Sequence, residues 1–303
     1  MILANVVIHS AATFGWRTMR TVTYLTRRSL LSKGALAIVG GAVVGSSAWS
    51  SEEELPLVRR VTLSHPSLPK AFDGLRVVQV SDVHAGAFMP PERLEHVRRV
   101  VESLSPDLVA FTGDQLDRRA VDAELFVQGF AGLEAPLGVF GVLGNHDHQA
   151  SPELGIAALD AIGAVPLVNA SAVIGASRGR LVIAGVDDLE GSPGRRPDFS
   201  VLASHADSFR LVLCHQPRGW RRARRNGAEL MLAGHTHGGQ IAFPSRGVNL
   251  ARLSTRYLAG PYRKGNHLLY VSRGVGVGAV PLRYGAPPEV DLITLRRAPL
   301  DVA

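Results

Sequence analysis

Short apolar runs alternate with longer amphipathic segments from residue 75 onward, and this alternation limits the fold more than any other feature. The runs 75–80, 108–112 and 139–143 are rich in β-branched and apolar side chains, as strands are. Segment 91–104, between the first two runs, repeats apolar residues at helical spacing. Nearly continuous apolar strands that alternate with helices predict an α/β fold whose strands are buried on both faces.

The second half of the chain has more strand-like runs and fewer helical patterns, which predicts a mixed sheet or a second sheet there. The remaining expected strands are 181–186, 211–213, 230–232, 268–271 and 290–295. The remaining expected helices are 123–133, 152–162, 199–206 and 217–226.

Polar clusters follow directly after five of the expected strands. The clusters are Asp82-Val83-His84, Gly113-Asp114, Gly144-Asn145-His146-Asp147, Cys214-His215 and Gly234-His235-Thr236-His237. Ligand sites in open α/β sheets form just beyond the carboxyl ends of the strands. The sequence therefore predicts that these side chains meet in one crevice.

The clustered residue types indicate a metal site. Carboxylates, an amide and several imidazoles form a mixed oxygen and nitrogen donor set, which suits Zn, Mn or Fe better than Ca or Mg. The set is larger than one ion needs, and two ions about 3.5–4 Å apart would use it fully. Alternate spacing puts Asp82 with His84, and His235 with His237, on the same side of an extended segment.

In this order, DxH, GD, GNHD, a lone His and GHTH resemble the motifs of the calcineurin-like metallophosphoesterase family, over about residues 60–297. The resemblance implies a sandwich of two mixed β-sheets flanked by helices. It also implies a role for each motif residue. Asp82, His84 and His237 would hold one metal, Asn145, His215 and His235 the other, Asp114 would bridge them, His146 would be the general acid, and Asp147 would orient His146.

The chemistry implied is hydrolysis of a phosphodiester or pyrophosphate by a hydroxide that bridges two Mn, Zn or Fe ions. His146 would protonate the leaving group. A phosphomonoesterase with the same centre remains open, because ligand motifs do not encode whether the pocket admits a second ester substituent. A non-catalytic scaffold is disfavoured, because every expected ligand is present.

The tail resembles a narrower bacterial branch of the family, which is often envelope-associated and includes enzymes acting on nucleotide-linked lipid precursors. The segments that carry this resemblance are 270–276, 281–283 and 288–289. His148, Arg273 and Arg283 are candidate substrate contacts, with structural roles as the alternative. The basic run from Arg218 to Arg225 is either a solvated helix face or a contact for anionic phospholipid headgroups.

Residues 1–48 have the pattern of an export signal. Arg27 and Arg28 precede an apolar stretch at 34–45, and small residues follow at 46–48. The arginine pair resembles a twin-arginine signal, although Leu30 replaces the more usual Phe, and it implies export of the folded protein by the twin-arginine machinery. An uncleaved anchor remains the alternative, although the stretch is shorter than the roughly 20 residues that span a bilayer.

The leader sets the expected domain boundaries. Met19 would give a leader of ordinary length, and we expect it to be the true start. Residues 49–56 would form a linker and residues 57–297 the phosphoesterase domain, which would lie outside the cytoplasm in the cell envelope whether or not the leader is cleaved.

Charge and cysteine content restrict the partners. The net charge is +7, but five of the 33 basic residues and none of the 26 acidic ones lie in residues 1–51. The remainder holds 28 basic and 26 acidic residues, so a nucleic-acid partner is not expected. The expected partner is a small-molecule or lipid phosphoester. The single cysteine, Cys214, excludes an intrachain disulfide and is expected to be buried in a strand.

Overall fold

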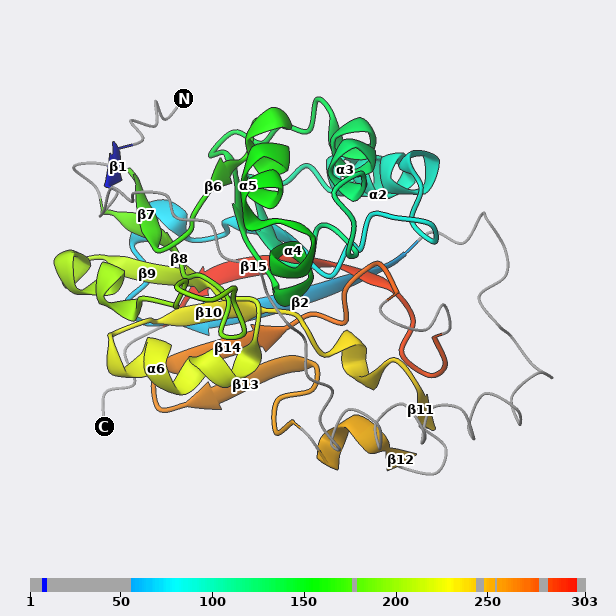
Figure 1. Cartoon of the computed structure of the whole chain (residues 1–303). Helices are drawn as coiled ribbons and strands as arrows, with labels where there is room; N and C mark the ends of the chain where they lie inside the picture. Colours follow the sequence, from blue (N-terminus) through cyan, green and yellow to red (C-terminus); the bar gives the residue numbers. More distant parts are fainter. Residues whose placement is uncertain are drawn as a thin grey trace.

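The computed structural model describes residues 7–9, 56–175, 179–243, 248–253, 255–277 and 283–298. Two β-sheets face each other, and helices cover their outer faces (Figure 1). The expected sandwich of two mixed sheets is therefore confirmed. The predicted leader and linker lie outside the described residues, apart from 7–9 and Pro56, and so do Pro281 and Leu282 of the tail motif.

One sheet has six strands, with β3 to β6 parallel in chain order and β15 antiparallel to β3. The edge strand β2 runs parallel to β15. In sheet order the strands are β2 (Leu57–His65), β15 (Glu289–Arg297), β3 (Arg76–Val80), β4 (Leu108–Thr112), β5 (Val139–Val142) and β6 (Val165–Pro166).

The other sheet has seven strands, with β8, β9, β10 and β14 parallel and the remaining three antiparallel to their neighbours. In order they are β1 (Val7–His9), β7 (Ala170–Ile174), β8 (Leu181–Gly185), β9 (Phe209–Leu213), β10 (Leu230–Ala233), β14 (His267–Val271) and β13 (Gly260–Lys264). A separate pair joins β11 (Ala242–Phe243) to β12 (Val248–Asn249).

The helices agree closely with the sequence pattern, except that 199–206 forms a 3₁₀ helix rather than an α-helix. The α-helices are α2 (Pro91–Ser103), α3 (Asp122–Phe130), α4 (Asn145–Ala150), α5 (Pro152–Ala161) and α6 (Trp220–Arg225). The 3₁₀ turns are Lys70–Phe72, Phe199–His205, Pro217–Gly219, His237–Gly239 and Leu250–Leu253. The α-helix and the strands that the sequence pattern did not predict are α4 and β1, β2, β6, β7, β11, β12 and β13.

Three apolar layers follow from the alternation of side chains along each strand. On β4, Leu108 and Ala110 face the other sheet, whereas Val109 and Phe111 face the helices α2, α3 and α5. Phe111 packs edge-on against Phe126, with ring centroids 5.5 Å apart. A third layer lies between the seven-stranded sheet and α6 and includes Cys214, which is buried directly after β9.

Polar side chains also join the two sheets inside the sandwich. Gln79 of β3 donates from Nε2 to the Thr112 hydroxyl and to the Ala233 carbonyl of β10, both at 2.9 Å. Tyr270 of β14 donates to Asp291 of β15 at 2.6 Å. Because buried polar groups are costly without partners, these bonds fix how one sheet lies on the other.

Asp291 should make stability depend on pH. Burial, with a smaller contribution from Glu289, raises the pKa of Asp291 to about 7. An unfolded aspartate titrates near about 3.9, so the folded state holds an extra proton between about pH 4 and 7. The protonated Asp291 side chain therefore contributes its full share of the unfolding free energy below about pH 4. That share falls as pH rises from about 4 and is lost once pH has passed through about 7.

Asparagine does not titrate, so Asp291→Asn should not lose stability over this range. The free energy of unfolding, measured with urea in the presence of a chelator, should therefore change less between pH 4 and 8 than in the unmodified chain. The difference from the unmodified chain should reach about 4 kcal/mol at most. Asp160→Asn, on the exposed end of α5, is the matched control. Identical profiles for all three proteins would contradict this account.

Candidate metal centre

The candidate ligands follow the carboxyl ends of strands from both sheets. Asp82 and His84 come after β3, Asp114 comes after β4, and Asn145 begins α4 after β5. From the facing sheet, His215 follows β9, and His235 and His237 follow β10. The structure brings these side chains together at one end of the sandwich.

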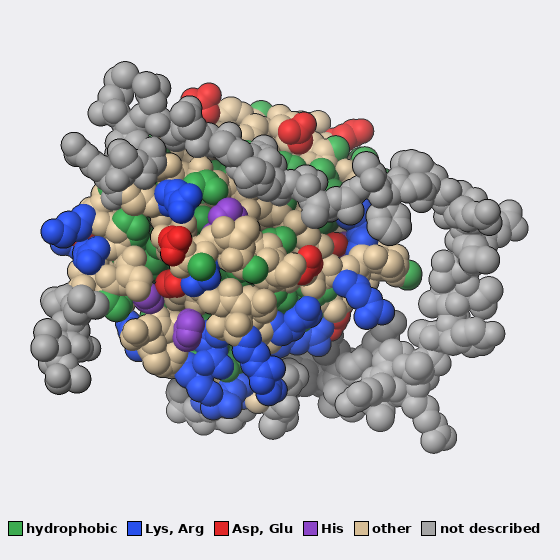
Figure 2. Space-filling model, turned by 90° about the vertical axis from the view of Figure 1, so that its left-hand side faces the viewer, with side chains coloured by type: hydrophobic (Ala, Val, Ile, Leu, Met, Phe, Trp, Pro, Cys, Tyr) green, Lys and Arg blue, Asp and Glu red, His purple; other side chains and the backbone are tan. Residues whose placement is uncertain are grey.

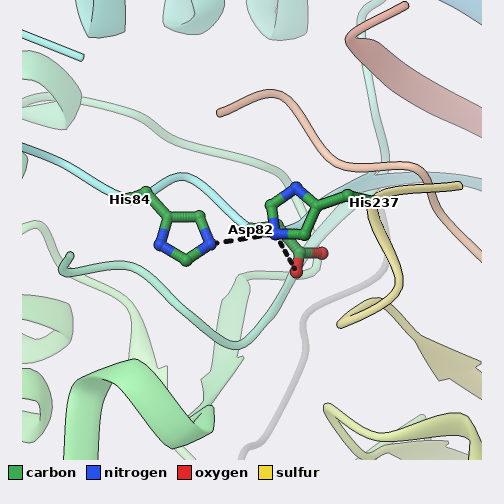
Figure 3. Close-up of side chains that lie close together, drawn as sticks. All are labelled: Asp82, His84 and His237. Atoms are coloured by element: carbon green, nitrogen blue, oxygen red, sulfur yellow. Dashed lines mark hydrogen bonds and ion pairs between the residues drawn. The ribbon is translucent and has the colours of Figure 1, made fainter. Parts of the chain in front are cut away.

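The first group of donors is formed by Asp82, His84 and His237, which point toward one another (Figure 3). Nε2 of His84 lies 3.1 Å from Nε2 of His237. The same His237 nitrogen lies 3.5 Å from Oδ1 of Asp82. All three residues are buried, so water does not surround these donor atoms.

The second group comprises Asp114, Asn145, His215 and His235. Nδ1 of His235 lies 3.0 Å from Oδ1 of Asn145 and 3.3 Å from Nε2 of His215. The Nδ1 atom of His215 faces the Thr112 carbonyl at 2.8 Å, which fixes the ring and leaves Nε2 directed into the group.

Asp114 links the two groups. Its Oδ2 lies 3.6 Å from Nε2 of His84 and 3.1 Å from Nε2 of His215. Ligands that bind one ion at about 2.0–2.1 Å are themselves about 2.8–3.4 Å apart in octahedral or tetrahedral geometry. The observed separations of 3.0 to 3.6 Å are close to that spacing, so the donor set fits metal ions on both sides of Asp114.

The backbone is strained where the ligands are. Asp82, His84, Asp114, His235 and His237 all have positive φ, between 48° and 72°. Side chains other than glycine rarely adopt this conformation, and it concentrates at functional sites. The neighbouring glycines allow close approach, because a Cβ at Gly144 would collide with Asp114 and one at Gly234 would collide with Asp82.

A model of the family described as calcineurin-like phosphoesterase matches residues 75–239, more than half of the chain. The chain belongs to the calcineurin-like phosphoesterase family. Its motifs, strand order and clustered donors agree with that assignment.

Three relatives show how far the similarity extends. The uncharacterized metallophosphoesterase YkuE of Bacillus subtilis is 29% identical, over 90% of this chain and 98% of YkuE. Phosphodiesterase YaeI of Escherichia coli is 31% identical, over 61% of this chain and 69% of YaeI. The UDP-2,3-diacylglucosamine pyrophosphatase LpxG of Chlamydia trachomatis is 41% identical, over 38% of this chain and 36% of LpxG.

In this phosphoesterase the carboxylate beside His146 is that of Asp117, which the sequence analysis missed. Nδ1 of His146 lies 2.7 Å from the Asp117 carbonyl and 3.4 Å from its Oδ1. Asp117 also lies 3.6 Å from Nδ1 of His84. Its position in the loop three residues after Asp114 was the available signal.

Asp147 contacts backbone N–H groups and not the His146 ring that it was expected to orient. Its two carboxylate oxygens accept backbone N–H groups of Gly144 and Leu116, at 2.8 and 2.9 Å. The side chain therefore holds the start of α4 against the loop after Asp114, and the expected contact with the His146 ring is made by Asp117 instead.

Charge within the cluster shifts several pKa values. Burial opposes ionisation of Asp114, but His215, His84 and His146 outweigh it and hold the pKa of Asp114 well below normal. Burial likewise lowers the pKa of His146, but hydrogen bonding to Asp117 and the charge of Asp114 raise it overall. Burial, then His215, lowers the pKa of His235 to about 4.

The three candidate substrate contacts have internal partners, which favours structural roles. Nη2 of Arg283 contacts Nδ1 of His237 at 3.0 Å, and its Nε donates to the Gly276 carbonyl at 2.8 Å. Arg273 pairs with Glu289 at 2.6 Å. His148 meets Asp187 at 2.7 Å.

A pocket of about 320 Å³ opens beside the second group of donors. Its lining includes His235, Thr236, Gln216 and Arg218. Arg218, the first residue of the basic run, pairs at this rim with Glu190 at 2.8 Å. A substrate could therefore reach the donors from this side.

Two substitutions should separate the roles of the two aspartates. Asp117→Asn keeps the carbonyl that holds His146 but removes the charge, so phosphoester turnover should fall about tenfold to hundredfold without loss of Tm. Asp147→Asn leaves a buried backbone N–H without an acceptor, which should cost about 1–3 kcal/mol of unfolding free energy.

Steady-state kinetics and thermal unfolding on both variants would test this assignment. Loss of turnover with unchanged Tm in Asp147→Asn, together with normal turnover in Asp117→Asn, would return the orienting role to Asp147.

Proposed function

We propose that this chain is a two-metal phosphodiesterase that cleaves phosphodiester or pyrophosphate bonds. The observation that carries the proposal is the position of Asp114, whose single Oδ2 atom faces ligand nitrogens of both donor groups. A carboxylate in that position is what a pair of ions about 3.5–4 Å apart requires.

The residues of the chain divide the work between holding metal and moving a proton. Asp82, His84 and His237 would hold one ion, and Asn145, His215 and His235 the other. When bound, a pair of Mn, Zn or Fe ions supplies Lewis acidity and activates water for attack on phosphorus. Because Nδ1 of His146 is held by Asp117, Nε2 is the nitrogen that can pass a proton to the leaving oxygen.

Phosphodiesterase YaeI and the pyrophosphatase LpxG support a substrate with two substituents on phosphorus. LpxG further supports a lipid-linked substrate, and the tail motif of the narrower branch points the same way.

Metal content and substrate preference test the proposal together. Two metal ions per chain are expected by elemental analysis, with faster hydrolysis of bis-p-nitrophenyl phosphate than of p-nitrophenyl phosphate. Asp114→Asn should lower turnover by about 10³-fold or more and reduce metal content, because the shared ligand loses its charge.

Asp160→Asn is the control, since it removes an exposed carboxylate far from any ligand in sequence. Full activity in Asp114→Asn would remove the two-metal mechanism. Preference for the monoester would instead establish a phosphomonoesterase with the same centre.

We also propose that the protein is exported by the twin-arginine machinery and acts in the cell envelope. The arginine pair at 27–28 and the apolar stretch at 34–45 support this. No helix among the described residues is long and apolar enough to cross a bilayer.

Replacing both arginines, Arg27→Lys with Arg28→Lys, should abolish export while leaving the protein folded in the cytoplasm, because the receptor reads the arginine pair. Cell fractionation would measure this, with Arg20→Lys as the matched control. Undiminished export of the double variant would exclude this route.

A further inference from the structure

Large apolar side chains are exposed mainly at the end of the molecule that contains the metal centre. Phe88, in the loop after β3, is 50% exposed, and Val121, in the loop after β4, is 47% exposed. Leu57, the first residue of β2, is 58% exposed, and Val58 is exposed beside it. Exposed apolar side chains grouped near a site indicate a contact surface.

The backbone fixes Phe88 in its exposed position. Gly86 and Met89 exchange backbone hydrogen bonds at 3.2 and 3.1 Å, which closes a tight turn around residues 87 and 88. Met89 is buried beneath the turn, so Phe88 is the residue that faces outward. The exposure of Phe88 is therefore built into the loop.

The second loop places Arg118 and Arg119 beside this turn, with the Arg119 guanidinium paired to Asp122 at 3.0 Å. Backbone N–H groups of Arg118 and Arg119 donate to Asp122 at 3.0 and 2.8 Å, so this loop is also held by its own contacts. Both arginines are exposed, and Val121 follows them. The loops touch where Gly86 meets Asp117, the residue that holds His146.

The chain enters the fold at this same end. The backbone N–H of Leu57 bonds to the Pro288 carbonyl at 2.9 Å, and Glu289 bonds to Gly274, which lies against Asp82. Figure 1 shows β2 beginning at the right-hand end. The 11 residues between the apolar stretch at 34–45 and Leu57 can span at most about 40 Å.

In the part of the chain that the structure describes, the opposite end of the molecule exposes basic side chains in place of large apolar ones. Nε2 of His65, at the end of β2, lies 2.5 Å from the Asn266 carbonyl in the β13–β14 turn, so both mark that end. Arg263 and Lys264 are exposed there, and Figure 2 shows Lys and Arg side chains gathered in the lower part of this face. Among the described residues with exposed large apolar side chains, none comes from the β13–β14 turn.

We infer that the metal-centre end docks on an anionic lipid bilayer, with Phe88 and Val121 entering the interface and Arg118 and Arg119 contacting headgroups. Aromatic and aliphatic side chains flanked by arginine are suited to this boundary. The inference rests on the proposed function in one respect, that a lipid-linked phosphoester would then meet the metal centre directly.

A second copy of the chain fits this surface less well. Pairing across a two-fold axis would bring Arg118 and Arg119 of one copy toward the same residues of the other. The apolar part is also a few separate side chains, whereas stable dimers bury a continuous patch. A bilayer with anionic headgroups satisfies both the apolar and the charged residues.

Tryptophan scanning on the full chain tests which end faces lipid. Phe88→Trp and Val121→Trp would be compared with Lys264→Trp, using vesicles of phosphatidylglycerol and phosphatidylcholine with brominated acyl chains. The tryptophans Trp16, Trp49 and Trp220 give a background that is measured on the unmodified chain. Quenching above background is expected at positions 88 and 121 and not at 264.

Vesicle sedimentation supplies the second measurement. Phe88→Ser with Val121→Ser should weaken binding at least about tenfold, whereas Lys264→Ser should leave it within about twofold. Hydrolysis of soluble bis-p-nitrophenyl phosphate should be the same in all of these variants, because neither loop residue touches a ligand. Failure of the proposed catalysis would remove this hydrolysis and leave vesicle binding intact.

Quenching at 264 alone, or equal binding by the double serine variant, would overturn the docking surface while leaving catalysis in place. Lipid-independent dimers that the double variant abolishes would overturn it too, in favour of a contact between two copies.

Discussion

The shared contacts of Asp114 are the interaction on which the rest of the site depends. Its carboxylate accepts a hydrogen bond from the backbone N–H of His146 and faces the imidazoles of His84 and His215. His84 and His146 come after strands of the six-stranded sheet, and His215 comes after a strand of the facing sheet. Burying a carboxylate without such partners costs free energy of folding. The strand ends of both sheets must therefore lie at the same level, so that their loops reach Asp114.

Several features of the sandwich serve that match. Gln79, Tyr270 and Asp291 fix one sheet on the other from inside the core. At five of the seven ligand positions the left-handed backbone turns the side chain toward the centre as the strand ends. The strain at these positions is tolerated because the buried strands on either side hold the backbone in place.

The arrangement of the two ends suggests how catalysis and location are combined. The loops that carry metal ligands continue into the loops that expose Phe88 and Val121, so one end of the fold both binds metal and presents an apolar, basic surface. Leu57, the first described residue of β2, lies at the same end. Under the proposed docking, a lipid-linked phosphoester at a bilayer would approach the donors without leaving the interface.

Much of this protein follows from short-range patterns in its sequence. Apolar runs of three to six residues locate the buried strands, because strands covered on both faces need continuous apolar side chains. Strand β2 was not predicted, because it contains Arg59 and Arg60 and so lacks a continuous apolar run. Charged residues are tolerated there because β2 is an edge strand. Asp117 was missed because its spacing from Asp114 gives only a weak signal, and its role depends on a loop folding back onto His146.

The sequence by itself determined the α/β class, the strand-ending ligand motifs and the chemistry that their side chains can perform. Only the tertiary structure decided that the two sheets face each other so that Asp114 is shared, that Asp147 holds backbone while Asp117 holds His146, and that Arg283 is buried against His237. It also decided which apolar residues remain exposed. The physical reason is that side-chain type and period are local, whereas contact between loops depends on how distant strands are stacked.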